Sequence, residues 1–213
     1  MGCVVKDFKK VVASGYDQIA QRYAAWSPTT LRGPKTKYLK VALRLVPAGG
    51  DALDLGCGTG EHLTRHLARH YHVTGVDLSP RSVALARQQV PEADFVVADM
   101  ATLHLPPASF DLITAFYSLI HVPRTEHPGV LASIRSWLRP GGVLIATMAA
   151  GAGGEGIEDD WLGAPMYWSN WDAETNRRLI TDAGLDLVDA IEETELEADK
   201  PVTHLWVVAR RGH

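Results

Sequence analysis

The chain lacks most of the features that mark secreted, membrane-spanning or nucleic-acid-binding proteins. Two cysteines among 213 residues provide no disulfide framework and agree with a reducing compartment. No apolar run approaches the roughly 18 residues of a membrane-spanning helix, and the first residues contain no apolar stretch of the kind found in signal peptides. We therefore expect a cytoplasmic protein that does not associate with membranes.

Its charge gives no reason to expect a nucleic-acid partner. The 21 basic and 25 acidic residues leave a net charge of -4, and no dense block of lysine or arginine occurs. Hydrophobic residues make up 46% and charged residues 22%, which is the balance of a globular protein. A chain of 213 residues can bury one sizeable core, so we expect a single domain, 1–213, with one active site. The sequence does not predict the oligomeric state.

Apolar segments of strand length alternate with helix-like segments along most of the chain. Strands are expected at 52–55, 72–76, 94–98, 111–116 and 142–147, and helices at 60–69, 80–89, 128–138 and 173–183. Strands that alternate with helices form parallel sheets through right-handed crossovers. Two final strands, 186–194 and 202–209, are expected to pair as an antiparallel hairpin at the sheet edge. The sequence therefore predicts the α/β class, with a doubly wound, seven-stranded, mostly parallel sheet.

Two segments outside this alternation are expected to lie near the active site. Residues 7–25 carry apolar side chains at spacings of mostly three and four, as in an amphipathic helix that could lie over the cleft, although Gly15 weakens the pattern. A glycine-rich stretch and an aromatic segment separate the last parallel strand from the next helix. We divide the expected domain into an N-terminal helical arm (1–47), a binding core (48–148), a lid (149–172) and a C-terminal helix with two edge strands (173–213).

A glycine-rich turn after the first strand is the most specific motif. From Asp54 to Gly60 it reads Asp-Leu-Gly-Cys-Gly-Thr-Gly. Glycines let the backbone turn tightly and approach a ligand, and amide groups at a helix N-terminus attract polar or anionic groups. The dinucleotide fingerprint needs glycine at position 61, which is glutamate here. This difference argues against a nicotinamide-dependent dehydrogenase.

Acidic residues end the next two strands. Asp77 lies 23 residues after Asp54, close to the spacing of about 20 at which such folds place an acid on ribose hydroxyls. Asp99 ends the third strand, where it could accept a hydrogen bond from an adenine amino group, and Met100 could pack on the ring. Together these side chains predict a bound nucleoside, although each could instead be only a turn or helix-capping residue.

In combination, these residues resemble the glycine loop, the ribose-binding acid and the adenine-binding acid of the class I S-adenosylmethionine (SAM)-dependent methyltransferases, which have a Rossmann-like fold. Two further segments, 110–114 and 138–142, extend the resemblance over nearly the whole chain. It implies a small bacterial-type enzyme that uses SAM, releases S-adenosylhomocysteine (SAH) and methylates a small molecule without a metal. The cofactor-binding residues would be Tyr16, Tyr23, Asp54, Gly56, Cys57, Gly58, Gly60, Asp77, Leu78, Asp99, Met100 and Phe116.

The resemblance also places the acceptor site just beyond the fourth strand. Methyl transfer from SAM is an in-line displacement that mainly requires the acceptor atom to be positioned and desolvated. Where that atom has a proton to lose, His121 is our choice of general base, because an unperturbed pKa near 6.5 suits proton removal at neutral pH. Tyr117 is expected to orient the acceptor. The alternatives are a structural role for His121 and packing of Tyr117 against the methionine part of SAM.

Aromatic residues are concentrated in the expected lid. Trp161, Met166, Tyr167 and Trp168 are our candidates for acceptor binding, and they predict an apolar or aromatic small molecule. Ordinary packing of the lid on the sheet would explain the same residues. Tyr16 and Tyr23 leave the same choice open, between closing over the cofactor and packing in a core.

The sequence does not identify the accepting atom, which could be oxygen, nitrogen, sulfur, carbon or a halide. It also leaves open a protein that senses SAM or uses it in a reaction other than methylation, because a fold does not fix chemistry. Three histidines recur every fourth residue between positions 62 and 70, but no cluster of cysteines or carboxylates supports a metal site there.

Overall fold

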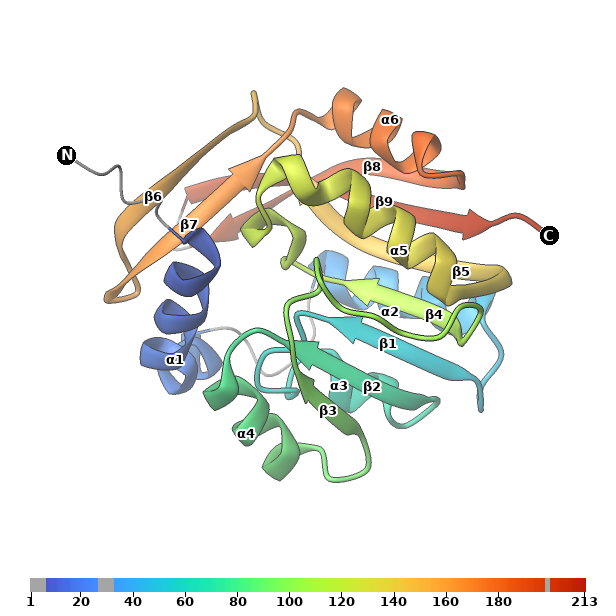
Figure 1. The fold of residues 1–213 in the computed structure, drawn as a ribbon, viewed down its shortest axis with the longest axis horizontal. Coiled ribbons are helices and arrows are strands. Elements are labelled where there is room, and N and C mark those ends of the chain that lie inside the picture. Colours follow the sequence, from blue (N-terminus) through green and yellow to red (C-terminus); the bar gives the residue numbers. More distant parts are fainter. Residues whose placement is uncertain (1–6, 27–32, 198–199) are drawn as a thin grey trace.

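The computed structural model describes residues 7–26, 33–197 and 200–213, and its centre is a seven-stranded sheet (Figure 1). The strand order is β3-β2-β1-β4-β5-β9-β8. β1 to β5 are parallel, and β9 pairs antiparallel with both β5 and β8. This confirms the doubly wound sheet with an antiparallel edge hairpin. The strands are β1 (Asp51–Leu55), β2 (His72–Asp77), β3 (Asp94–Val97), β4 (Phe110–Ala115), β5 (Leu138–Ala149), β8 (Leu185–Glu197) and β9 (Lys200–Arg211).

Helices cover both faces of this sheet. The side chains of Leu112 and Ile113 point to opposite faces of β4, since successive residues of a strand alternate, and each belongs to a different buried apolar cluster. The Ile113 cluster includes α5 (His127–Trp137) and α6 (Ala173–Asp182). The Leu112 cluster includes α2 (Gly33–Leu45) and α3 (Thr64–Leu67). α4 (Pro80–Gln89) packs on β3 through a small cluster of its own.

The helix after the glycine loop is much shorter than expected. The sequence predicts a helix over 60–69, but α3 has only four residues, and the chain turns from Gly60 to Leu63 before it begins. Gly60 has a φ of +76°, outside the helical region. The Thr64 hydroxyl donates a hydrogen bond of 2.6 Å to the Asp54 carboxylate, which connects the start of α3 to the end of β1.

α1 and a β-hairpin form a layer apart from the seven-stranded sheet. The hairpin consists of β6 (Gly154–Trp161) and β7 (Ala164–Asn170), and α1 (Phe8–Trp26) packs against β7 (Figure 1). Met166 and Tyr167 of β7 are fully buried there. We call α1 and the β6–β7 hairpin the cap. Residues 1–6 and 27–32 of the expected N-terminal arm lie outside the described residues.

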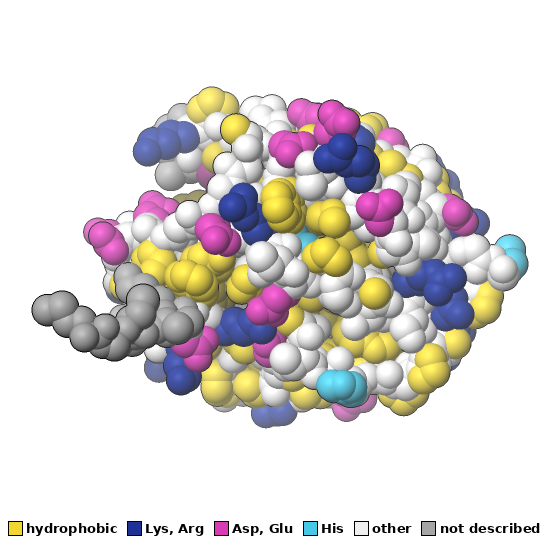
Figure 2. Space-filling view, turned by 45° about the horizontal axis from the view of Figure 1, so that its top comes forward, with side chains coloured by type: hydrophobic (Ala, Val, Ile, Leu, Met, Phe, Trp, Pro, Cys, Tyr) yellow, Lys and Arg dark blue, Asp and Glu magenta, His cyan; other side chains and the backbone are white. Residues whose placement is uncertain are grey.

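Charged and hydrophobic side chains are mixed on the face of the molecule drawn in Figure 2. On the face shown in Figure 2, Lys and Arg side chains alternate with Asp and Glu side chains and with hydrophobic ones. Among the described residues, no helix is both long and apolar enough to cross a membrane.

Candidate active site

The glycine loop lies where the strand order reverses, between β1 and β4. Gly56, Gly58 and Gly60 have φ values of +78°, +55° and +76°, a backbone conformation that side chains with a Cβ rarely adopt. A Cβ on Gly56 would collide with the Ser118 side chain, whereas nothing lies within 4 Å of the corresponding position on Gly58. Ligands of open α/β sheets bind at such a reversal. The loop therefore presents its backbone, and the open side of Gly58, to a cleft.

Asp54 supports this loop from behind. Its carboxylate is buried and accepts hydrogen bonds from the hydroxyls of Thr64 at 2.6 Å and Thr114 at 2.9 Å. Burial raises the pKa of Asp54 to about 6, although both hydrogen bonds oppose the shift. Because Asp54 does not line the cleft, its contribution is to hold the loop in place.

Two other acids face the cleft. Asp77 Oδ2 accepts the Gly58 N–H at 2.9 Å and Oδ1 accepts the Ser79 N–H at 2.9 Å, so this carboxylate is fixed to the loop. Burial raises the pKa of Asp77, with the backbone donors acting in the opposite direction. Asp99 lies at the end of the neighbouring strand, and its Oδ1 accepts a hydrogen bond from the Ala101 N–H at 2.9 Å. Both carboxylates keep free lone pairs for ligand donors.

The cleft brings together most of the expected cofactor residues. It is a narrow cavity of about 90 Å³. Two of the expected residues, Cys57 and Gly60, do not line this cavity, and Gly60 packs against α4. The Cys57 thiol is buried, which raises its pKa. Of the expected residues, the lining contains Tyr16, Tyr23, Gly56, Gly58, Asp77, Leu78, Asp99, Met100, Phe116, Tyr117 and His121.

His121 is held at the inner end of the cleft by two hydrogen bonds. Its Nδ1 lies 2.8 Å from the Tyr167 carbonyl oxygen, which can only accept, so we assign the ring proton to Nδ1. Nε2 is then an acceptor, and the Tyr16 hydroxyl donates to it at 2.9 Å. Burial lowers the pKa of His121 to about 4, although the hydrogen bond to the Tyr167 carbonyl acts to raise it. The imidazole is therefore neutral at pH 7, with its basic nitrogen directed to Tyr16.

Tyr117 lies beside His121 in a strained conformation. Its φ is +56°, which a non-glycine residue adopts mainly where the surroundings require it. The Tyr117 N–H donates to Thr147 Oγ1, and its hydroxyl donates to the Glu195 carboxylate. Burial raises the pKa of Tyr117, and the hydrogen bond to Glu195 raises it further. Tyr117 is thus a hydrogen-bond donor rather than a base.

A second and larger cavity of about 800 Å³ adjoins the cleft. Four residues line both cavities: Tyr16, Tyr23, Tyr117 and His121. Trp161 and Trp168, two of the expected acceptor residues, line the larger one, and their rings meet edge to face at 5.3 Å between centroids. The wall shared by the two cavities is therefore made of the expected catalytic residues and the two tyrosines of α1.

Met166 and Tyr167 lie elsewhere. Both are fully buried between α1 and β7, where the Tyr167 ring stacks on Phe8 at 4.3 Å, and neither lines a cavity. Met166 packs at Gly15 of α1, and the Tyr167 hydroxyl donates to Glu155 of β6 at 3.0 Å, so neither side chain faces the two cavities. Tyr167 still contributes to the site through its backbone, since its carbonyl orients His121.

The structure adds site residues that we did not expect from the sequence. Ser118 lines the cleft and donates to the Leu55 carbonyl at 2.7 Å. Lys9 lines it as well, and Lys35 lies over the Tyr117 ring with its Nζ 4.7 Å from the centroid. Glu195 and Glu197 of β8 line the larger cavity. The sequence carried a signal for them, because glutamates alternate at positions 193, 195 and 197 of β8, which places them on one face of the strand.

The residues of the cleft fit a nucleoside that carries a cationic amino-acid chain. Two carboxylates are available for hydroxyl and amino donors, and the apolar side chains of Leu78 and Met100 line the same cleft and could cover a flat ring. The open side of Gly58 leaves room for the chain to pass along the loop. Among the described residues, no group of three or more His, Cys, Asp or Glu could hold a metal ion.

Comparison with known proteins agrees with this geometry. The family model for the methyltransferase domain matches residues 52–142. A malonyl-acyl-carrier-protein O-methyltransferase from Serratia marcescens is 35% identical over 114 residues, which are 53% of this chain and 44% of that protein. The chain spans less than half the length of the curated relatives it matches.

Solved structures share the fold over the whole chain. The 1,6-didemethyltoxoflavin-N1-methyltransferase of Burkholderia thailandensis, solved with its substrate and SAH, has a TM-score of 0.75 at 20% identity, covering 100% of this chain and 92% of that one. The 4+2 cyclase SpnF has a TM-score of 0.71 at 20% identity, covering 94% of each chain. By its family match, residues 52–142 of the chain are a methyltransferase domain, and the chain shares the fold of SAM-dependent methyltransferases.

Proposed function

We propose that the protein transfers the methyl group of SAM to a small-molecule acceptor that enters through the larger cavity. The observation that carries this proposal is the shared wall of the two cavities, which contains His121, Tyr16 and Tyr117. A cofactor in the cleft and an acceptor in the larger cavity would meet at this wall. SAM supplies an electrophilic methyl group, so the protein has to align the acceptor atom and exclude water.

Each end of the cofactor has its own partners in this proposal. Asp77 binds the ribose hydroxyls and Asp99 the adenine amino group, while Leu78 and Met100 cover the ring. The backbone at Gly56 and Gly58 receives the methionine part, with Tyr23 and Phe116 beside it. Asp54, Cys57 and Gly60 act indirectly, by supporting the loop.

His121 removes a proton from the acceptor, directly or through Tyr16. Its Nε2 is unprotonated and points to the Tyr16 hydroxyl, which lines both cavities. When the acceptor transfers a proton to Nε2, the bond from Nδ1 to the Tyr167 carbonyl stabilises the imidazolium. Tyr117 donates its hydroxyl hydrogen bond to Glu195 and orients the acceptor through its ring and its hydroxyl oxygen. No metal takes part.

The acceptor has an apolar or aromatic body. Trp161 and Trp168 line the larger cavity with the tyrosines of α1, and flat side chains of this kind bind flat ligands. Met166 and Tyr167 contribute by packing behind this wall. The charged groups of the cavity, among them Lys35 and Glu195, add polar recognition beside Tyr117.

Calorimetric titration with SAH, followed by an assay of SAH release with phenols, thiols, amines and halides, tests the proposal. We expect wild-type protein to bind SAH and to release it from SAM with one acceptor class. His121→Ala should lower turnover about 100-fold or more and leave SAH affinity nearly unchanged. His104→Ala is the matched control, because His104 is exposed between β3 and β4. Absence of SAH binding by the wild type would refute the proposal.

A SAM-dependent reaction other than methylation is the second candidate, because the cyclase SpnF shares this fold. In that case SAH would bind, yet no acceptor in the screen would generate SAH from SAM. A pure sensor would give the same result. Both alternatives are abandoned if a single acceptor class gives His121-dependent turnover.

A further inference from the structure

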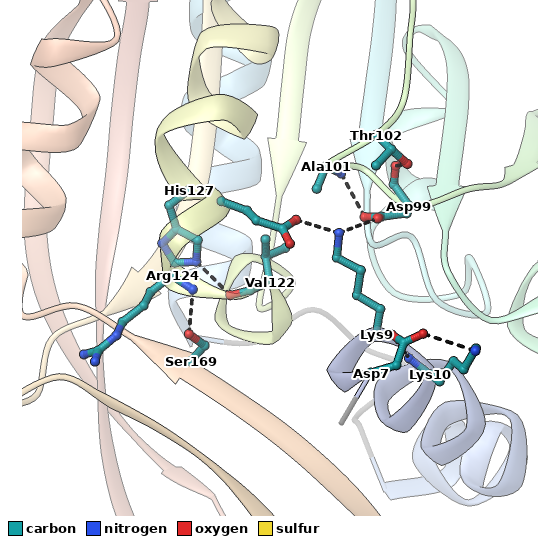
Figure 3. A network of polar contacts seen from close by, with 11 residues as sticks. Asp7, Lys9, Lys10, Asp99, Ala101, Thr102, Val122, Arg124, His127 and Ser169 are labelled. Carbon is teal, nitrogen blue, oxygen red and sulfur yellow. Dashed lines mark hydrogen bonds and ion pairs between the residues drawn. The ribbon is translucent and has the colours of Figure 1, made fainter. Parts of the chain in front are cut away.

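Lys9 joins the cap to the core at the mouth of the cleft. From the first turn of α1, its Nζ reaches Asp99 Oδ2 at 2.7 Å and Glu126 Oε2 at 2.6 Å (Figure 3). Asp99 follows β3, and Glu126 belongs to the 3-10 turn Arg124–Glu126 that precedes α5. One ammonium group therefore connects three segments that are far apart in the sequence.

The neighbouring lysine on the same helix makes no such connection. Lys10 points away from the cleft, and among the residues that the structure describes it forms an ion pair with Asp7 alone, at 3.3 Å (Figure 3). The side chain of Lys10 is 85% exposed, whereas that of Lys9 is 27% exposed and lines the cleft. Burial alone would lower the pKa of Lys9, but the two carboxylates outweigh it and raise the pKa, so the ammonium stays charged.

The Asp99 carboxylate is fixed from two sides. Ala101 N–H binds Oδ1 at 2.9 Å, and Lys9 binds Oδ2. An ionised carboxylate has about four acceptor positions, so both oxygens keep a lone pair for a further donor. Without Lys9, Glu126 would be left as an uncompensated negative charge beside Asp99, and nothing on the α1 side would hold Oδ2 in place.

α1 contacts the core through both apolar and polar groups. The buried apolar residues around α1 come from α1 itself and β7, and Leu78 of the core packs against them. The polar contacts are Lys9 at Asp99, Tyr16 at His121, and Asp17 at Ser79, whose hydroxyl donates to Asp17 at 2.6 Å. Of these, only Lys9 reaches the Asp99 side of the cleft.

α1 lies over this end of the cleft, where Lys9 and Val12 of the helix line it together with Asp99. A helix that covers a bound ligand has to move outward when the ligand leaves, and the two ion pairs of Lys9 would have to break for it to do so.

We propose that Lys9 is a positioning residue for the cofactor, which holds α1 over the bound adenosine and orients Asp99 toward the adenine amino group. Lys9 does not touch the reacting atoms. This inference rests on the proposed function, because it requires a SAM-type ligand in the cleft. It assigns part of the cofactor affinity, and most of the control of cofactor release, to an ion pair on the cap.

The test compares Lys9→Met with Lys10→Met, using SAH as the ligand and no acceptor. We expect Lys9→Met to weaken SAH binding about three- to tenfold, as suits the loss of partly exposed ion pairs, and to speed SAH release. Lys10→Met should behave as wild type. Lys9→Arg, which keeps the charge, should restore most of the affinity. In hydrogen exchange of the SAH complex, α1 amides should exchange faster in Lys9→Met only.

Salt gives a second readout that a purely structural role would not produce. Ion pairs that are partly exposed are screened by salt, so the wild-type affinity should approach that of Lys9→Met as salt is raised. Equal SAH affinity in the two lysine variants would overturn the inference. So would tighter binding by Lys9→Met, which would mean that Lys9 blocks the site. Failure of the wild type to bind SAH would refute the proposed function instead.

Discussion

At the scale of single residues, the protonation state of His121 determines what the site can do. Burial lowers the pKa of His121 to about 4, whereas in the unfolded chain this pKa is near the ordinary histidine value of about 6.5. Between these two pH values the imidazole is therefore neutral in the folded protein and protonated in the unfolded chain. Acidification through this window therefore favours unfolding. The same shift keeps His121 available as a base at neutral pH.

We therefore predict that His121→Asn flattens the pH dependence of stability. Between pH 7.5 and pH 5, the wild type should lose about 2 kcal/mol more free energy of unfolding than the variant, since one pKa unit corresponds to about 1.4 kcal/mol. Urea denaturation at the two pH values measures this difference. Parallel losses in the two proteins would show that His121 is protonated in the fold as readily as in the unfolded chain.

Sequence reasoning located His121 but not its partners. A histidine just after a strand of the βα alternation is recognisable, because the carboxyl ends of parallel strands form the ligand edge. Tyr16 lies 105 positions away in sequence, and the Tyr167 carbonyl lies 46 positions away. Contacts at such separations depend on how the cap packs, which local periodicity does not encode.

At the scale of elements, Gly15 shows how packing can override helix propensity. Glycine inside a helix is less favourable than alanine by about 1 kcal/mol, which is why the sequence pattern of 7–25 weakens there. In the structure a Cβ on Gly15 would lie 2.6 Å from the Pro165 carbonyl oxygen and 2.9 Å from Met166 Cε. The missing side chain thus lets α1 approach β7 closely.

We predict that Gly15→Ala destabilises the protein in spite of alanine's higher helix propensity. Overpacking of a close contact commonly amounts to about 1–3 kcal/mol, which exceeds the gain in propensity. Ser14→Ala is the control, since Ser14 is exposed on the same helix and should be neutral or slightly stabilising. Compared with wild type, the thermal midpoint should fall for Gly15→Ala and should stay unchanged or rise slightly for Ser14→Ala. A higher thermal midpoint for Gly15→Ala would mean that β7 can shift to accommodate the added methyl group at little cost in stability.

The β6–β7 hairpin was the element least accessible from sequence. We expected a lid at 149–172 with glycines and aromatic residues, but not two paired strands. β6 is mostly exposed and lacks an alternating burial pattern, and β7 is buried at both odd and even positions. Neither strand therefore carries the period of two by which strands are recognised.

At the scale of the whole molecule, the doubly wound sheet, its antiparallel edge hairpin and the expected ligand edge could be predicted from the sequence because they depend on repeated local patterns. Glycine turns, strand-ending acids and the βα alternation each point to the same edge. The division of the space above that edge into a narrow cleft and a larger cavity was not predictable, since Tyr16 and Tyr23 of α1 help to form the boundary.

This arrangement predicts that a ligand in the cleft stabilises the whole fold. SAH at 100 times its dissociation constant should add about 2.7 kcal/mol to the free energy of unfolding, which is about 5–10 °C in thermal midpoint for a chain of this size. Asp77→Asn should need at least about tenfold more SAH for the same shift, a loss of about 1.4 kcal/mol in binding.

The control for this prediction lies at the opposite edge of the same sheet. Asp94 is exposed and begins β3, whereas Asp77 ends β2, so the two carboxylates belong to opposite ends of paired parallel strands. Asp94→Asn should keep the wild-type response to SAH, because ligands bind only beyond the carboxyl ends of such strands. Each shift is measured against the ligand-free variant, so a change in basal stability does not affect the comparison. If Asp77→Asn and Asp94→Asn respond alike, SAH does not use the acid at the end of β2, and the assignment of the cleft to an adenosine group fails.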